Sequence, residues 1–168
     1  MKTKGEIAVA IRFINPATLH KPPTYTQVVE VAGPARTIFI SGQLGGGLDG
    51  RLVGPDFRAQ AVQVFENLKA ALAAVGASFR DVVKVNSYLA DIKDLPVLRD
   101  VRIGYLNPAA LPASTTLGGV SFAREGALLE VEVVAVVPAT SARPAAGARR
   151  AKRAGRKTGK VSARRKAR

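Results

Sequence analysis

The chain has 168 residues, 47% of them hydrophobic, and a net charge of +14, which fits one domain with a hydrophobic core and excludes a wholly disordered protein. It contains no cysteine and one histidine, His20, which excludes disulfides, thiolate nucleophiles, zinc sites built on cysteine and metal sites built on several histidines. No apolar run approaches the roughly 18 residues of a membrane-spanning helix, and residues 1–5 lack the apolar stretch of a secretory signal, so we expect a cytoplasmic protein with no membrane partner.

The first third of the chain predicts three strands. Residues 7–13, 25–31 and 37–41 are rich in β-branched and aromatic side chains, and segments with proline or glycine separate them. Residues 45–50, Gly-Gly-Gly-Leu-Asp-Gly, are a predicted loop. The GK(S/T) sequence of a phosphate-binding loop does not follow them, so we assign no nucleotide site there.

The clearest predicted element is a helix that runs from Asp56 to the residue before Gly76, because apolar residues recur there at steps of three or four. Asp56 can cap its first amides, and Gly76 can end it. A strand is predicted over residues 82–90. A second helix follows, with Asp94 as its cap and an apolar stripe along residues 95–105.

Two further strands, over residues 115–122 and 128–137, are predicted to pair as a closing hairpin. In the second of them, apolar residues alternate with a face that carries Glu130 and Glu132. The element order is therefore β-β-β-α-β-α-β-β. This order predicts an α+β domain over residues 1–140, with two helices on one face of a mixed sheet.

The last part of the chain differs from the rest in charge. All 12 acidic residues lie between Glu6 and Glu132, whereas residues 141–168 carry 12 of the 26 lysines and arginines, which leaves +2 for residues 1–140. Without an apolar period, residues 141–168 are predicted to be a disordered basic tail. Such a tail favours non-specific contact with nucleic acid or another polyanion, and the alternative is a solvated tail that aids solubility.

Seven short motifs occur together in one order and spacing, and together they resemble the Rid (YjgF/RidA) family of imine deaminases between residues 15 and 139. The motifs are PTYTQVV at 23–29, FISGQ at 39–43, Gln60 with ENL at 66–68, AVGAS at 74–78, DVVK at 81–84, LPAST at 111–115 and LEVE at 129–132. Each motif alone is weak evidence, and the resemblance rests on their common register.

The resemblance implies a chorismate-mutase-like fold that assembles as a homotrimer, with clefts at the subunit interfaces. It also implies hydrolysis of reactive enamines and imines to 2-oxo acids and ammonia. An imine is already electrophilic, so a positioned water and hydrogen bonds to the developing charge are sufficient. We therefore expect a small-molecule substrate and neither a cofactor nor a metal.

One motif departs from the family in the residue that binds the substrate carboxylate. Deaminating members read P-A-R-(S/T), whereas this chain reads Pro-Ala-Ser-Thr, with Ser114 at the arginine position. A serine hydroxyl carries no charge and cannot act as a bidentate fork. Arg99 aligns with an asparagine of the family. Two alternatives remain open: the carboxylate-binding role has moved to Arg99, or the ligand has no carboxylate.

The resemblance also assigns roles to individual residues, and each role has an ordinary structural alternative. Glu130 matches the water-orienting glutamate, a semi-buried acid or base, or else lies on a solvated strand face. Tyr25 either covers the cleft or packs as an edge aromatic. Thr116 aligns with a residue whose backbone amide meets the substrate. Ser41 and Gly42 either line the cleft or end a strand.

Three functions follow from these observations. The first is hydrolysis of imines with an altered substrate choice. The second is a non-catalytic trimer that binds a small molecule after loss of the arginine. The third is association with nucleic acid through the basic tail, with the domain as a scaffold.

Overall fold

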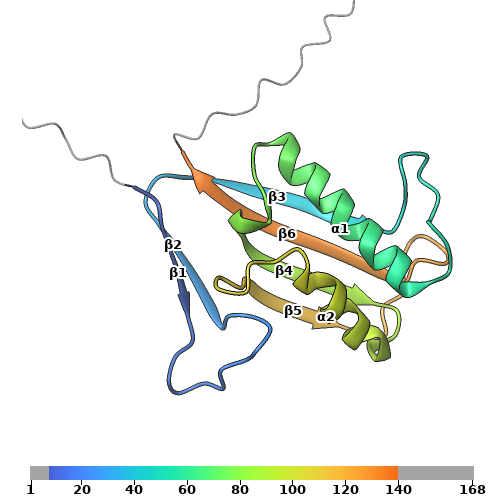
Figure 1. Cartoon of the computed structure of the whole chain (residues 1–168), viewed down its shortest axis with the longest axis horizontal. Coiled ribbons are helices and arrows are strands. Elements are labelled where there is room, and N and C mark those ends of the chain that lie inside the picture. Colours follow the sequence, from blue (N-terminus) through green and yellow to red (C-terminus); the bar gives the residue numbers. More distant parts are fainter. Residues whose placement is uncertain (1–7, 140–168) are drawn as a thin grey trace, which may run out of the picture.

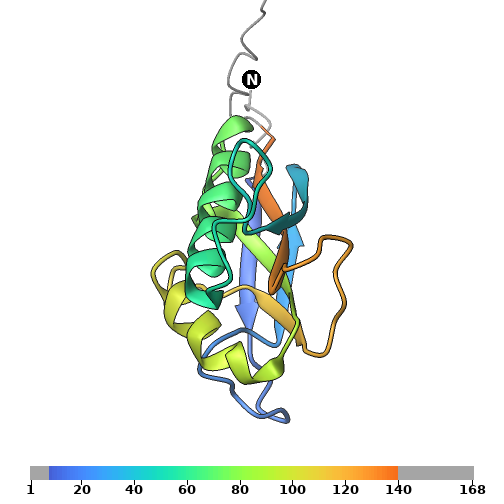
Figure 2. The same cartoon turned by 90° about the vertical axis from the view of Figure 1, so that its right-hand side faces the viewer.

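The computed structural model describes residues 8–139, which form a four-stranded sheet, two helices on one of its faces and a separate β-hairpin (Figures 1 and 2). The elements, in chain order, are β1 (Ala10–Ile14), β2 (Val28–Ala32), β3 (Ala35–Leu44), α1 (Phe57–Ala74), β4 (Val82–Leu89), α2 (Leu95–Ile103), β5 (Ala113–Leu117) and β6 (Leu129–Pro138). Short 3₁₀ turns, Phe79–Asp81 and Ile92–Asp94, precede β4 and α2. The predicted α+β class and helix arrangement are confirmed, whereas the basic tail lies outside the described residues.

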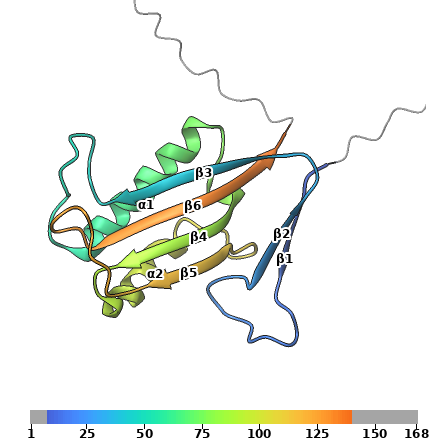
Figure 3. The same cartoon turned by 180° about the vertical axis from the view of Figure 1, so that it is seen from behind.

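The sheet has the strand order β3-β6-β4-β5 (Figure 3). β6 runs antiparallel to both neighbours, and β4 and β5 run parallel to each other with α2 as the crossover between them. The predicted hairpin of the last two strands is therefore wrong. β6 is apolar on its buried face along its whole length, so burial is greatest when it inserts between β3 and β4 instead of lying at the edge beside β5.

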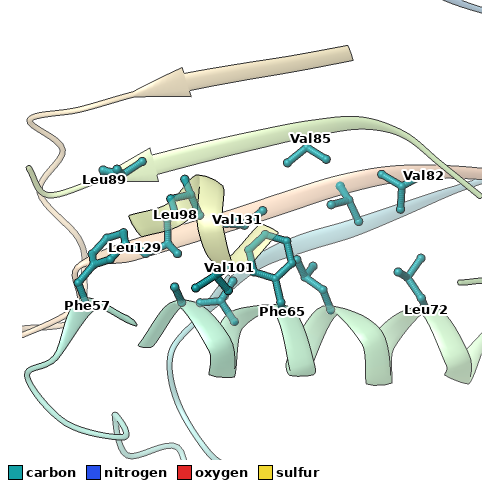
Figure 4. Packing of buried hydrophobic residues seen from close by; sticks show 14 of the residues in the cluster. Phe57, Phe65, Leu72, Val82, Val85, Leu89, Leu98, Val101, Leu129 and Val131 are labelled. Atoms are coloured by element: carbon teal, nitrogen blue, oxygen red, sulfur yellow. The ribbon is translucent and has the colours of Figure 1, made fainter. Parts of the chain in front are cut away.

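α1 has the caps that the sequence predicts. The Ala59 amide donates to Asp56 Oδ1 at 2.8 Å, and Gly76, just beyond the helix, has a φ of +72° that suits glycine. The apolar side of the helix lies against β3 and β6, where Phe65 and Leu72 are fully buried (Figure 4). This contact forms most of the core beneath the sheet.

α2 begins differently from the prediction. Asp94 occupies the N-cap position, but its side chain makes no capping hydrogen bond. Asp91 caps the preceding 3₁₀ turn instead, with its Oδ1 accepting from the Lys93 amide at 2.9 Å. The 3₁₀ turn leads directly into α2, so Asp94 has helical backbone angles that turn its side chain away from the first amides. Burial and the charge of Asp91 raise the pKa of Asp94.

β1 and β2 form a hairpin apart from the main sheet (Figure 3). The predicted second strand started at Tyr25, but β2 starts at Val28. The preceding loop instead turns toward the edge strand, and the Thr26 amide donates to the carbonyl of Pro112 at 3.1 Å. This contact holds Tyr25 beside β5.

The face of the sheet away from the helices is uncovered (Figure 2). It carries Phe39, which is 79% exposed, together with Leu117 and the polar side chains of β4 and β6. Within residues 8–139, no helix is both long and apolar enough to cross a membrane.

Candidate functional site

A cavity of about 260 Å³ opens between the loop before β2, the helix α2 and the strand β5. The side chains that line it are Thr24, Tyr25, Leu95, Arg99, Arg102, Ser114 and Thr116. The cavity thus brings together four of the residues singled out from the sequence. None of its lining side chains is acidic.

The register of β5 explains why its two hydroxyls lie in this cavity. Ser114 pairs with Val85 and Thr116 with Ser87, and both β4 partners are buried on the helix-covered face. Thr115 lies on the other face, where its hydroxyl accepts from Lys84 at 2.7 Å. Alternation along β5 therefore directs Ser114 and Thr116 toward α2.

Arg102 is a residue of this cavity that the sequence analysis did not single out. It is 6% exposed, and its guanidinium donates from Nη1 to Ser114 Oγ and from Nη2 to the Thr24 carbonyl, each at 3.2 Å. Burial lowers its pKa, and the positive charge of Arg99 lowers it further. The signal for it was its position three residues after Arg99, which puts both on one side of a helix.

Glu130, Ser41 and Gly42 form a second group, on the uncovered face of the sheet. β3 has a bulge between Ile40 and Gln43, and the side chain of Glu130 lies against Gly42 where the strand bulges. A Cβ atom at Gly42 would overlap the Glu130 carboxylate, so any larger residue at that position would displace this side chain. Ser41 itself is exposed.

The two glutamates of β6 differ in their hydrogen bonds. Glu132 Oε1 accepts from Asn86 Nδ2 at 2.8 Å and from Tyr88 Oη at 3.1 Å. The hydrogen bond to Glu132, burial, and the charges of Glu132 and Glu130 raise the pKa of Tyr88. Glu130 makes no hydrogen bond with any residue between 8 and 139, so its half-buried carboxylate can accept hydrogen bonds from a ligand or water.

The predicted site residues therefore divide between the two faces of the sheet. Tyr25, Arg99, Ser114 and Thr116 lie on the helix side, whereas Glu130 and its neighbours lie on the uncovered side. Across residues 8–139, no group of three or more metal-ligating side chains is present. Within one copy of the chain, each face carries only half of the predicted site.

The comparison with protein families agrees with the motifs. A family model described as Endoribonuclease L-PSP matches residues 18–137. The chain belongs to this family. The sequence motifs predicted the same family under the name Rid. The comparison confirms this prediction.

Sequence relatives of this Rid chain cover most of its domain. It is 34% identical over 114 residues to the 2-iminobutanoate/2-iminopropanoate deaminase of Dermatophagoides farinae, which covers 67% of this chain and 85% of the relative. It is 35% identical over 113 residues to a RutC family protein of Aquifex aeolicus, with coverage of 67% and 87%.

Solved structures support the same Rid fold. The crystal structure of the Rid family protein YyfB from Yersinia pestis has a TM-score of 0.66 at 30% identity, and covers 76% of this chain and 98% of that one. RidA from an Antarctic Psychrobacter has a TM-score of 0.56 at 38% identity, with coverage of 73% and 93%. The fold predicted from the sequence is thus that of the family.

Proposed function

We propose that this chain hydrolyses reactive enamines and imines to carbonyl compounds and ammonia, with a substrate choice of its own. The free carboxylate of Glu130, held against Gly42 without a hydrogen bond from residues 8–139, is the observation that carries the proposal. Curated relatives named 2-iminobutanoate/2-iminopropanoate deaminase from a mite, mouse and cattle are 34–38% identical to this chain, which supports it.

The proposed reaction needs one carboxyl group that takes and returns a proton. Water adds to the imine carbon, the C=N electron pair moves to nitrogen, and a proton of that water passes to Glu130. The protonated carboxyl then transfers this proton to the amine. Glu130 next takes the hydroxyl proton of this carbinolamine and returns it to the nitrogen, so that the C–N bond breaks as the carbonyl forms and ammonia leaves. No oxidant or covalent intermediate is needed.

A homotrimer would join the two halves of the site. The Glu130 group and the Tyr25 cavity lie on opposite faces of one sheet, so a single substrate can meet both only if two copies of the chain each supply one face. The exposed Phe39, on the Glu130 face of the edge strand β3, supports such a contact, because a second copy packed there would cover its apolar side chain.

Ammonia release from enzymatically generated imines tests the proposal. A panel of 2-imino acids and 2-aminoacrylate is assayed with the wild type, Glu130→Gln and Glu132→Gln. We expect Glu130→Gln to lose about 100-fold or more of the acceleration. Glu132→Gln is the matched control, because its amide oxygen can still accept from Asn86 and Tyr88.

Two outcomes would contradict the hydrolase. The first is a wild type that accelerates none of the imines, which would favour the non-catalytic binding trimer. The second is a Glu130→Gln variant as active as Glu132→Gln, because the proton would then be carried by another group.

A further inference from the structure

Arg102 is a buried cation without an acidic partner. It is 6% exposed, and both of its hydrogen-bond acceptors, Ser114 Oγ and the Thr24 carbonyl, are neutral. The acidic residue of α2, Asp100, lines a neighbouring cavity with Arg99 and Arg102, but its carboxylate pairs with Arg58 at 3.1 Å. Burial of an unpaired charge costs free energy. A bound anion beside the Arg102 guanidinium would therefore be strongly favourable.

Arg99 adds a second positive charge that favours a bound anion. It lines the same cavity one turn earlier on α2 and makes no ion pair with any residue between 8 and 139. Its charge acts on Arg102 strongly enough to lower the pKa of that guanidinium, in addition to the effect of burial. Two arginines that face one cavity without an acidic lining residue provide a site for an anion.

The location of the guanidinium relates it to the arginine expected on β5. Its Nη1 lies 3.2 Å from the hydroxyl of Ser114, the position at which the motif of deaminating relatives has arginine. Serine is small enough to leave room for a guanidinium that arrives from α2. The positive charge at this end of the cavity is therefore present, but it comes from the helix.

We propose that Arg102, with Arg99 beside it, binds the carboxylate of a small 2-imino acid substrate or its 2-oxo acid product in place of the missing β5 arginine. This inference rests on the proposed function for the identity of the ligand. Arg102 has five N–H donors. Its Nη1 donates to Ser114 and its Nη2 donates to the Thr24 carbonyl, so further N–H groups remain for a carboxylate. Leu95 offers an apolar surface for a short alkyl side chain.

A substitution that supplies an internal anion tests the site without removal of Arg102. Ser114→Asp puts a carboxylate within reach of the guanidinium, whereas Ser114→Asn is of the same size and neutral. Binding of 2-oxobutanoate to the full chain is measured by isothermal titration calorimetry. The uncharged ketone 2-butanone is the ligand control.

We expect Ser114→Asp to bind 2-oxobutanoate at least about tenfold more weakly than wild type, because the new carboxylate competes for Arg102. Its melting temperature should equal or exceed that of wild type, since a buried cation has gained a partner. Ser114→Asn should bind within about threefold of wild type. Wild type should bind 2-butanone far more weakly than the oxo acid.

The outcomes separate this inference from the hydrolase. Loss of oxo acid binding in Ser114→Asp, with no imine hydrolysis by wild type, would support the anion site and contradict the proposed function. Imine hydrolysis by wild type, with an unchanged KM for 2-imino acids in Ser114→Asp, would contradict only the anion site. The anion site is also overturned by a wild type that does not bind 2-oxobutanoate, or by a melting temperature of Ser114→Asp below that of wild type.

Discussion

Glu130 and Glu132 lie two residues apart on the same face of β6, yet they have different chemistry available to them. Glu132 is held by the side chains of Asn86 and Tyr88, whereas Glu130 lies over Gly42 with its oxygens free of the described residues. The difference comes from β4, where Asn86 lies opposite Glu132, and where Tyr88 lies opposite Glu130 but donates its hydroxyl proton to Glu132. Two carboxylates of one strand therefore differ in the hydrogen-bond capacity that they leave for a ligand.

Glu66 links the stability of the domain to acid pH. The hydroxyl of Tyr105 donates to Glu66 Oε1 at 3.0 Å, and this bond, followed by the one from Lys69, lowers the pKa of the carboxyl. A carboxyl with a lowered pKa in the folded state stabilises the fold above its unfolded pKa. That contribution is lost as the pH falls through the folded-state pKa.

Tyr105→Phe tests this link. The variant keeps the ring that stacks on Phe65 at 4.9 Å between centroids, but it loses the hydroxyl. We expect its free energy of unfolding to fall below that of wild type at pH 7, and this deficit to be smaller at an acid pH, where Glu66 becomes protonated in both states. Urea unfolding at the two pH values measures the difference. An equal deficit at both would assign the effect to packing instead of to the carboxyl.

The sequence predicted most residues of the candidate site, but it did not predict how they are arranged in space. Motif register brought out Tyr25, Ser114 and Thr116, which the fold brings to one cavity. Arg102 was missed because two arginines three residues apart on a short helix also have the pattern of a solvated helix face. Only the tertiary fold shows that this side chain is buried against β5.

At the scale of elements, one buried amide connects α1 to the loop before it and to the loop that leads into β6. Gln60 Nε2 donates to the carbonyls of Gly54 at 2.8 Å and Gly126 at 2.9 Å, and its Oε1 accepts from the Leu128 amide at 3.0 Å. Gly45 approaches so closely that a Cβ atom there would lie 2.6 Å from Gln60 Cβ. The helix start and the β6 start are therefore fixed by the same side chain.

Gln60→Leu should reduce the free energy of unfolding by about 2–4 kcal/mol, because three part-buried backbone groups lose their partner while the volume is kept. Gln63→Leu, one turn further along α1, is the matched control. Its amide makes one bond, to Asn67 on the same helix, so we expect a loss below about 1 kcal/mol. Urea denaturation of the two variants gives the comparison. Equal losses would show that the three bonds of Gln60 add nothing to stability.

Elements with local signals were predicted well, and those that depend on partners were not. α1 has its apolar period and both caps within its own sequence, and the structure confirms them. The pairing of β5 depends on which strand lies across from it, and no local residue encodes that choice. The segment between β5 and β6 was compatible with a hairpin, but the wholly apolar buried face of β6 gains more by insertion between β3 and β4.

At the scale of the whole molecule, the uncovered face of the sheet is the surface through which we expect copies of the chain to associate. Phe39 lies on this face of the edge strand β3, beside its cross-strand partner Val134 on β6, and Leu117 on the opposite edge strand β5 is 52% exposed. Single apolar residues are common on protein surfaces, but large exposed apolar side chains on an uncovered sheet face favour contact with another chain. We expect this face to form the contact of the predicted homotrimer.

Phe39→Lys should convert a homotrimer to a monomer, because a charge at the centre of an apolar contact cannot be paired there. Size-exclusion chromatography with light scattering measures the mass. Leu48→Lys is the matched control, since Leu48 is fully exposed on a loop tip and should leave the mass unchanged. If the site is shared between copies, imine hydrolysis should fall with the mass. A wild-type monomer, or a trimeric Phe39→Lys variant, would contradict the prediction.

The position of β6 has a consequence for how the protein is made. β6 comes last among the described strands, yet it lies between β3 and β4. When every other element has left the ribosome, β3 and β4 still lack the strand that lies between them. The sheet therefore cannot close until residue 138 is free. Throughout that interval the nascent chain exposes two strand edges and the apolar side of α1, which attract other chains. The topology therefore exposes the protein to aggregation during translation, at a stage when the finished domain does not yet exist.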